Sequence, residues 1–147
     1  MDEAGFWEIM NLLDWEKEGE DDDVLLPVIE RLVALDDSAI FAFDDIMARL
    51  LYDIDGRAWA EDIYGNLDNV SSDDFLYTRC VALVNGKDYY EAIKNRAETL
   101  DADLEFEAIL YAPPIAWAVK HDADVEGYPH ETKYSFETGS NVAKWSV

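Results

Sequence analysis

Apolar residues recur along most of this chain at steps of three and four, the spacing that places them on one face of an α-helix. Charged residues fill the remaining positions, so each stretch is amphipathic. The stretches expected to form helices span residues 3–17, 22–35, 37–55, 57–64, 71–84, 88–99 and 104–112, with one or two further turns over 115–120. The pattern therefore predicts an all-α fold, a single compact domain of about six or seven short helices.

Capping residues and prolines indicate where some of these helices begin and end. Ser71 stands three residues before Asp74, which is the spacing of a capping box and predicts a helix start. Pro27 is expected to lie near the first turn of its helix, where amide donors are free. Pro113-Pro114 is expected to break or kink the helix that precedes it.

The helical pattern is lost from His121 onward. The apolar and aromatic residues of this part are too many for a purely solvated tail: Tyr128, Tyr134, Phe136, Val142 and Trp145. We expect them to pack as extended segments on the helices, or to form a short β-hairpin around Gly139. The predicted organisation is a helical domain over residues 1–120 and an irregular C-terminal segment over 121–147, packed on it or partly mobile.

Charge changes this picture most. The chain has 34 Asp and Glu against 11 Lys and Arg, a formal net charge of -23 over 147 residues. Self-repulsion on that scale opposes compaction, so a basic partner, bound cations or high salt is expected to offset it. Half of the residues are hydrophobic and 13% are aromatic, which would be unusual for a disordered acidic tail. The excess acid is therefore expected to coat a folded surface, and it argues against direct binding of nucleic acid or of an anionic membrane.

Catalytic residue patterns are weak. Cys80 is the single cysteine and falls on an apolar helix face with Phe75 and Leu83, so we expect a buried, inert thiol. A chain with one cysteine forms no internal disulfide, which fits a reducing cytoplasm. No basic stretch precedes an apolar run at the N-terminus, and no apolar run reaches the ~20 residues of a membrane span. We expect no enzyme, no cofactor, no signal peptide and no membrane association.

Two groups of polar side chains allow either a binding or a structural interpretation. Arg79 could hold an anionic ligand, but an internal pair with one of the many carboxylates is favoured. Groups able to bind a metal gather near the C-terminus, at His121, Asp122, Asp124, His130 and Glu131. Their spacing matches no standard zinc or calcium loop, so solvated loop residues are favoured over a metal site.

Acidic runs mark several expected helix starts. Glu20–Asp23 lacks the alternating ligands and central glycine of an EF-hand, so it is interpreted as a solvated face or a partner-binding surface. Further acid is expected on neighbouring helices at Asp36-Asp37, Asp44-Asp45 and Asp53–Asp55. Ser72–Asp74 is interpreted as a helix cap or as a binding cluster.

Several short motifs resemble a bacterial protein family. They are Phe6-Trp7-Glu8-Ile9, Phe43-Asp44, Arg57-Ala58-Trp59-Ala60, and Ser72-Asp73-Asp74-Phe75 followed by Tyr77, Arg79, Gly86, Tyr90 and Ala92. Together they resemble domain of unknown function 4240 over roughly residues 2–111. The resemblance implies a small, mostly helical domain and no known activity.

The charge and the weak catalytic patterns together favour a binding protein. The leading hypothesis is an immunity or inhibitor protein that neutralises a basic toxin or nuclease by covering its cationic surface. The alternative is a salt-adapted regulatory or housekeeping helical domain of unknown activity. The residues expected to bind the partner are Asp21, Asp22, Asp23, Asp36, Asp37, Asp73 and Asp74.

Overall fold

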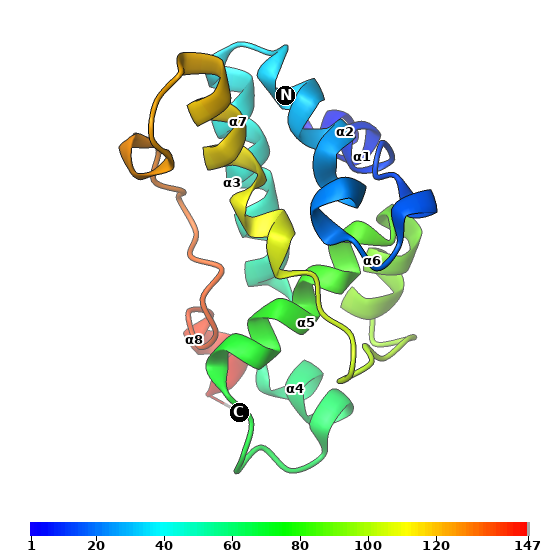
Figure 1. Cartoon of the computed structure of the whole chain (residues 1–147). Coiled ribbons are helices and arrows are strands. Elements are labelled where there is room, and N and C mark those ends of the chain that lie inside the picture. The colour runs from blue at the N-terminus through cyan, green and yellow to red at the C-terminus, as the bar shows by residue number, and fades with distance from the viewer. Residues whose placement is uncertain (147) are drawn as a thin grey trace. The chain divides into compact units, whose positions relative to one another are not determined.

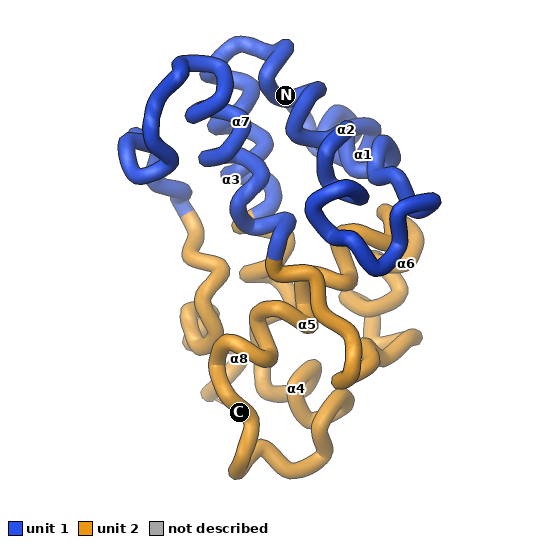
Figure 2. The backbone as a smooth tube through the Cα atoms, in the orientation of Figure 1, with its two compact units in different colours: residues 1–47, 108–133 blue, residues 48–107, 134–147 orange. Residues whose placement is uncertain are grey.

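A computed structural model describes residues 1–146 and shows a helical protein with no strand among those residues. The predicted all-α class is confirmed. The residues group into two compact units, coloured separately in Figure 2. Unit 1 comprises residues 1–47 and 108–133, and unit 2 comprises residues 48–107 and 134–147. Each unit therefore combines two segments that are distant in the sequence.

Unit 1 takes three helices from its first segment and one from its second (Figure 1). It holds α1 (Glu3–Met10), α2 (Asp21–Val33), the first part of α3 (Asp37–Asp53) and α7 (Ala112–His121), with the short 3-10 turns η1 (Trp15–Lys17) and η3 (Val125–Gly127). Helix α2 packs against α7. The ring of Phe6 contacts those of Trp7 and Phe43, with centroids 5.0 and 4.8 Å apart, so aromatic packing joins α1 to α3 in the core.

Helix α2 contains a proline deeper than the sequence suggested. The helix begins at Asp21, so Pro27 is its seventh residue and lies inside the helix rather than near the first turn. Proline has no amide hydrogen, so the carbonyl of Asp23 receives no helical bond from position 27. The buried stripe of α2 still faces the core: Val24, Leu25, Val28 and Leu32. Tertiary packing therefore maintains the helix across the proline.

Unit 2 is organised around one largely buried helix. It holds the end of α3, α4 (Arg57–Tyr64), α5 (Ser72–Val84), α6 (Lys87–Lys94) and α8 (Val142–Trp145), and the 3-10 turn η2 (Glu107–Tyr111) begins in it. Nine residues of α5 are buried, from Phe75 to Val84 except Tyr77. A helix that is apolar on most sides is expected in a core rather than on a surface. Ser71 is the N-cap of α5, and its hydroxyl accepts a hydrogen bond from the Asp74 amide at 2.9 Å, as the capping box predicted.

Three stretches expected to be helical are shorter than predicted. The helix expected over residues 3–17 ends at Met10, and Trp15–Lys17 forms only the 3-10 turn η1. Helix α6 ends at Lys94 because Arg96 adopts a left-handed conformation, with a φ of 60°. The region expected as a helix over 104–112 forms only the turn η2, and Pro113 and Pro114 lie in the first turn of α7. The prolines therefore start a helix instead of breaking one, because the first-turn amides need no intrahelical acceptor.

The expected hairpin around Gly139 does not form. Residues 134–146 instead form an irregular strap, which we call the C-terminal strap, ending in α8. The amides of Gly139 and Asn141 donate to the Asp55 carboxylate, each at 3.1 Å, instead of to a neighbouring strand. Gly139 has a φ of 93°, which favours glycine at this turn. A buried carboxylate thus decides the path of the chain here.

Candidate functional sites

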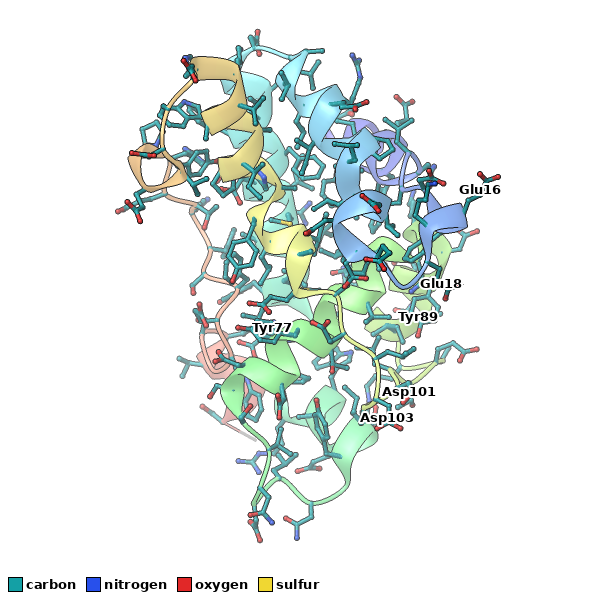
Figure 3. All side chains as sticks on the ribbon, in the orientation of Figure 1. Glu16, Glu18, Tyr77, Tyr89, Asp101 and Asp103 are labelled. Carbon is teal, nitrogen blue, oxygen red and sulfur yellow. The ribbon has the colours of Figure 1, made fainter. Side chains whose placement is uncertain are left out.

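Exposed acids of unit 1 gather around the turn between α1 and α2. They are Glu16, Glu18, Glu20, Asp22 and Asp23. The turn is held by Asp14, whose carboxylate accepts from the Glu16 amide at 3.2 Å and whose own amide donates to the Val24 carbonyl at 2.9 Å. Figure 3 shows the Glu16 side chain extending away from the ribbon. We call residues 12–26 the N-terminal acidic surface.

Large apolar side chains are also exposed on this surface. Leu12, Trp15 and Leu26 are 43%, 41% and 49% exposed, respectively. The surface therefore mixes carboxylates with an aromatic ring and two leucines. Exposed aromatic residues are enriched in protein interfaces, whereas a purely solvated acidic coat has no need of them.

The predicted binding residues of unit 1 lie at both ends of α2. Asp22 and Asp23 are exposed in its first turn, and Asp21 beside them is half-buried. Asp36 and Asp37 follow the other end of the helix, roughly 18 Å along its axis from the first turn. The structure thus separates residues that the sequence grouped into one candidate surface.

Asp36 and Asp37 both make internal interactions. Asp36 caps α3: its carboxylate accepts from the Ala39 amide and the Ser38 hydroxyl, both at 3.0 Å, and these bonds lower its pKa. The Asp37 carboxylate lies 2.9 Å from His121 Nε2 and 3.0 Å from Lys120 Nζ, and these hydrogen bonds lower its pKa. Both side chains therefore contribute to the ends of α3 and α7.

Asp73 and Asp74, the remaining predicted binding residues, belong to unit 2. Both are exposed in the first turn of α5. Carboxylates in a first turn interact favourably with the helix dipole, so these side chains support the helix whether or not a partner binds them.

The residues near the C-terminus that could bind a metal are mostly exposed, as expected for solvated residues: His121, Asp122, Asp124 and Glu131. The two histidines also contact helix α3, which the sequence did not predict. His121 Nε2 contacts Asp37, and His130 Nε2 lies 2.9 Å from the Asp45 carboxylate. The ring of His130 also stacks on Phe41, with centroids 4.8 Å apart. Within the described residues, no three or more groups of His, Cys, Asp or Glu gather as they would around a metal ion.

Asp44 is buried, although the sequence placed it on the solvated side of its helix. It is 6% exposed and accepts a hydrogen bond from the Tyr128 hydroxyl at 2.9 Å. Burial raises its pKa from 3.8 to about 6, against the opposing effect of the Tyr128 bond. Asp44 therefore serves the interior of unit 1 and is not part of an acidic surface.

Arg79 pairs internally, as favoured from the sequence, but its partner was not identified there. Arg79 and Asp55 are both fully buried, and Arg79 Nη2 lies 3.9 Å from the Asp55 carboxylate. Arg79 also donates to the carbonyls of Leu51 and Phe136 at 2.9 and 3.0 Å, and to the Thr138 hydroxyl at 3.1 Å. These bonds use three of the five N–H donors of the guanidinium, while its buried Nε has no hydrogen-bond partner among the described residues. Because the bonds join Arg79 to the end of α3 and to the C-terminal strap, we assign it a structural role.

Asp55 completes this buried cluster from the other side. Its carboxylate accepts from the Trp145 indole at 2.7 Å, besides the amides of Gly139 and Asn141. The sequence had assigned Asp55 to a surface run of acid, and its burial corrects that interpretation. Together, Arg79 and Asp55 attach the C-terminal strap to unit 2.

Unit 2 contains a pocket of about 190 Å³ that sequence analysis did not predict. Its walls are largely apolar, with three hydroxyl groups near the start of α5. The lining residues are Ala60, Leu67, Val70, Ser71, Ser72, Phe75, Thr138 and Trp145. They come from α4, the following loop, α5 and the C-terminal strap, so only the folded chain brings them together.

Cys80 is fully buried, as expected, and burial raises the pKa of its thiol to about 12. The thiol is therefore protonated at neutral pH and unsuited to act as a nucleophile. Among the helices of residues 1–146, none combines the length and apolarity that a membrane span requires.

Comparison with protein families identifies the family of the chain. A family model described as "Protein of unknown function (DUF4240)" matches residues 1–119. The match ends before the C-terminal strap. No curated protein and no solved structure is significantly similar to the chain.

Proposed function

The chain belongs to the DUF4240 family of proteins of unknown function, and we propose that it is a binding protein that takes a basic protein partner on its N-terminal acidic surface. The most specific form of this proposal is that the protein is an immunity or inhibitor protein, which covers the cationic surface of a toxin or nuclease. The observation that carries this proposal is the mixture of carboxylates with exposed Trp15, Leu12 and Leu26 on one segment of unit 1.

Each component of this surface would have its own part in binding. The carboxylates would attract a basic partner over a distance of about one Debye length and raise the association rate. The aromatic and leucine side chains would then bury apolar area and slow dissociation. An acidic surface that served solubility alone would gain nothing from exposing Trp15.

Ion pairing within the protein leaves the acidic excess in place. Among the described residues, the cationic side chains that already pair with carboxylates include Arg49, Arg57, Arg79, Arg96 and Lys120. Their pairing partners differ from the exposed acids of the N-terminal surface. A partner with many Lys and Arg would therefore find these carboxylates available for new contacts.

The test is affinity capture from the native host with the full chain as bait. We expect recovery of one basic protein with an isoelectric point above ~9, released by moderate salt because the contacts are largely electrostatic. Asp22→Asn/Asp23→Asn should lower the association rate by about three- to tenfold at low salt. Trp15→Ala should raise the dissociation rate by about tenfold.

A matched control removes the same charge from unit 2. Asp101→Asn/Asp103→Asn neutralises two exposed carboxylates, visible in Figure 3, outside the proposed surface. It should leave binding close to that of the unmodified chain. Recovery of no basic protein at any salt concentration, or equal losses in both double variants, would favour the salt-adapted domain instead.

A further inference from the structure

The pocket of unit 2 is a second candidate binding site, independent of the proposed protein-binding surface. We propose that it binds a small molecule made of one aromatic ring and a short chain ending in a cationic amine. The size of the pocket, the groups that fix its walls and the charge around it lead to this ligand class.

The size of the pocket sets the size of the ligand. A cavity of ~150 Å³ lined by apolar side chains is known to take benzene. The pocket here has about 190 Å³, so it admits one ring and a short substituent but no fused ring system of drug size. Phe75 and Trp145 supply aromatic walls, whose edges and faces pack well against a third ring.

The walls are held in place without a ligand. Trp145 is fixed by the 2.7 Å bond from its indole to buried Asp55. Thr138 donates its hydroxyl hydrogen to the Ser72 carbonyl at 2.7 Å and accepts from Arg79 at 3.1 Å, so two hydrogen bonds hold its side chain. The pocket is therefore preformed, and a ligand would lose little free energy to ordering its walls.

Hydroxyl groups at the start of α5 could bind the polar end of the ligand. Ser71 uses an oxygen lone pair to cap the helix, which leaves its own hydroxyl hydrogen to donate. The Ser72 hydroxyl lies beside it on the pocket wall. These groups accept and donate, so by themselves they do not select a charge on the ligand.

Charge near the pocket selects a cation. Asp68 and Asp73 directly follow lining residues, Asp74 bonds to lining Ser71 through its amide, and Glu137 directly precedes lining Thr138. All four are exposed acids. The start of α5 contributes only about half a positive charge, which four carboxylates outweigh.

Most of the nearby cations are already paired. Lys144, which directly precedes lining Trp145, donates to the Asp53 carbonyl and keeps its positive charge, but it offsets only one of the four carboxylates. Arg79, against Phe75, is matched by buried Asp55. Arg57, whose Nε lies 3.5 Å from the Trp145 carbonyl, pairs with Glu61. A ligand carboxylate would therefore meet net repulsion, and an ammonium group net attraction.

The experiment compares three probes that share one ring. Protonated 2-phenylethylamine, neutral 2-phenylethanol and anionic 3-phenylpropanoate are titrated into the full chain at low salt. Binding is followed by calorimetry and by the NMR signal of the Trp145 indole N–H. We expect saturable binding of the amine with a dissociation constant on the order of 0.1–1 mM. The alcohol and then the carboxylate should each bind about two- to fivefold more weakly.

Variants test the place and the charge separately. Val70→Trp should fill the pocket and abolish binding of all three probes, and Leu67→Trp on the same loop serves if that variant fails to fold. Asp73→Asn/Asp74→Asn should reduce the preference for the amine over the carboxylate. Asp101→Asn/Asp103→Asn, the same charge change elsewhere in unit 2, should leave that preference intact.

Three results would overturn the proposal. They are no saturable binding at ~10 mM of any probe, equal affinity for the amine and the carboxylate, or unchanged binding when the pocket is filled. None of them bears on the N-terminal acidic surface, because that surface belongs to unit 1. The two proposals therefore succeed or fail separately.

Discussion

Individual charged residues in this protein have very different environments despite similar sequence surroundings. Asp22 and Asp23 are exposed, whereas Asp44 and Asp55 are buried in runs that look equally acidic. A buried charge is tolerated only where other groups compensate for lost water. Asp55 has such compensation in Arg79 and three N–H donors. Asp44 accepts a hydrogen bond from Tyr128, and its burial raises its pKa to about 6.

Removing one partner of the buried pair should destabilise the protein strongly. We expect Arg79→Ala to lower the free energy of unfolding by about 3–5 kcal/mol, because Asp55 is left buried without its counter-charge. Urea denaturation followed by circular dichroism measures the loss. The matched control is Arg96→Ala, which breaks an exposed Arg–Asp pair with two 2.8 Å contacts and should have a much smaller effect. Equal losses in the two variants would contradict a structural role for burial.

Asp44 should make stability depend on pH in a distinctive direction. Its pKa is about 6 in the folded chain against 3.8 for an ordinary Asp, so the folded state binds the proton first as pH falls. Burial of the charged form therefore costs stability above pH ~6, and that cost disappears as pH falls to ~4. At neutral pH, the raised pKa of Asp44 corresponds to a loss of about 3 kcal/mol in the free energy of unfolding.

The variant Asp44→Asn removes this ionisation while keeping an oxygen that can accept from Tyr128. We expect it to be more stable than the unmodified chain at pH 7 and nearly equal to it at pH 4. Urea denaturation of both proteins between pH 4 and pH 7 gives the difference in their free energies of unfolding. The other carboxylates contribute equally to both proteins, so their effects cancel in this difference. A difference that stays constant with pH would show that Asp44 keeps an ordinary pKa.

At the scale of elements, prolines show how position decides effect. Pro27 lies inside α2, where it removes a helical hydrogen bond, while Pro113 and Pro114 lie in the first turn of α7, where no bond is lost. The same residue type thus weakens one helix and starts another.

Replacing the interior proline should stabilise the chain. We expect Pro27→Ala to raise the free energy of unfolding by about 1–3 kcal/mol, because the restored amide can bond to the Asp23 carbonyl. Pro114→Ala is the control and should be neutral or slightly destabilising, since it frees the unfolded chain without adding a needed bond. Thermal and urea denaturation report both. If Pro27→Ala destabilised the protein, the packing of the Pro27 ring would contribute more to stability than the restored helical hydrogen bond.

At the scale of the whole molecule, the formal net charge of -23 opposes folding throughout the chain. Raising NaCl from 0.01 to 1 M shortens the Debye length from about 30 to about 3 Å, so repulsion among exposed carboxylates should fall. We therefore expect the melting temperature to rise steadily with salt.

A variant with less charge provides the comparison for this prediction. Glu18→Gln, Glu30→Gln, Asp103→Asn and Glu131→Gln remove four exposed carboxylates that lie outside the first turn of any helix, so no favourable contact with a helix dipole is lost. Together they change the formal charge from -23 to -19. This variant should melt at a higher temperature in low salt and gain less from added salt. If salt has no effect on either protein, self-repulsion contributes little, and the acidic excess needs no partner to offset it.

Local patterns predicted what depends on near neighbours. The Ser71 cap, the span of α4 and the burial of Cys80 follow from residues within a few positions of one another. Prediction failed where a residue contacts another that is far away in the sequence. The pocket is an example, because Trp145 forms part of its wall together with residues 60–75, and Trp145 lies outside the residues that match the family.

By itself, the sequence determined the helical class, most helix positions, the acidic excess and the internal pairing of Arg79, because periodicity, capping and charge are properties of short stretches. Only the tertiary structure decided which acids are buried. Asp44 meets Tyr128 across 84 positions and Asp55 meets Trp145 across 90. Hydrogen bonds over such separations depend on how the helices pack, which no local pattern of polar and apolar residues specifies.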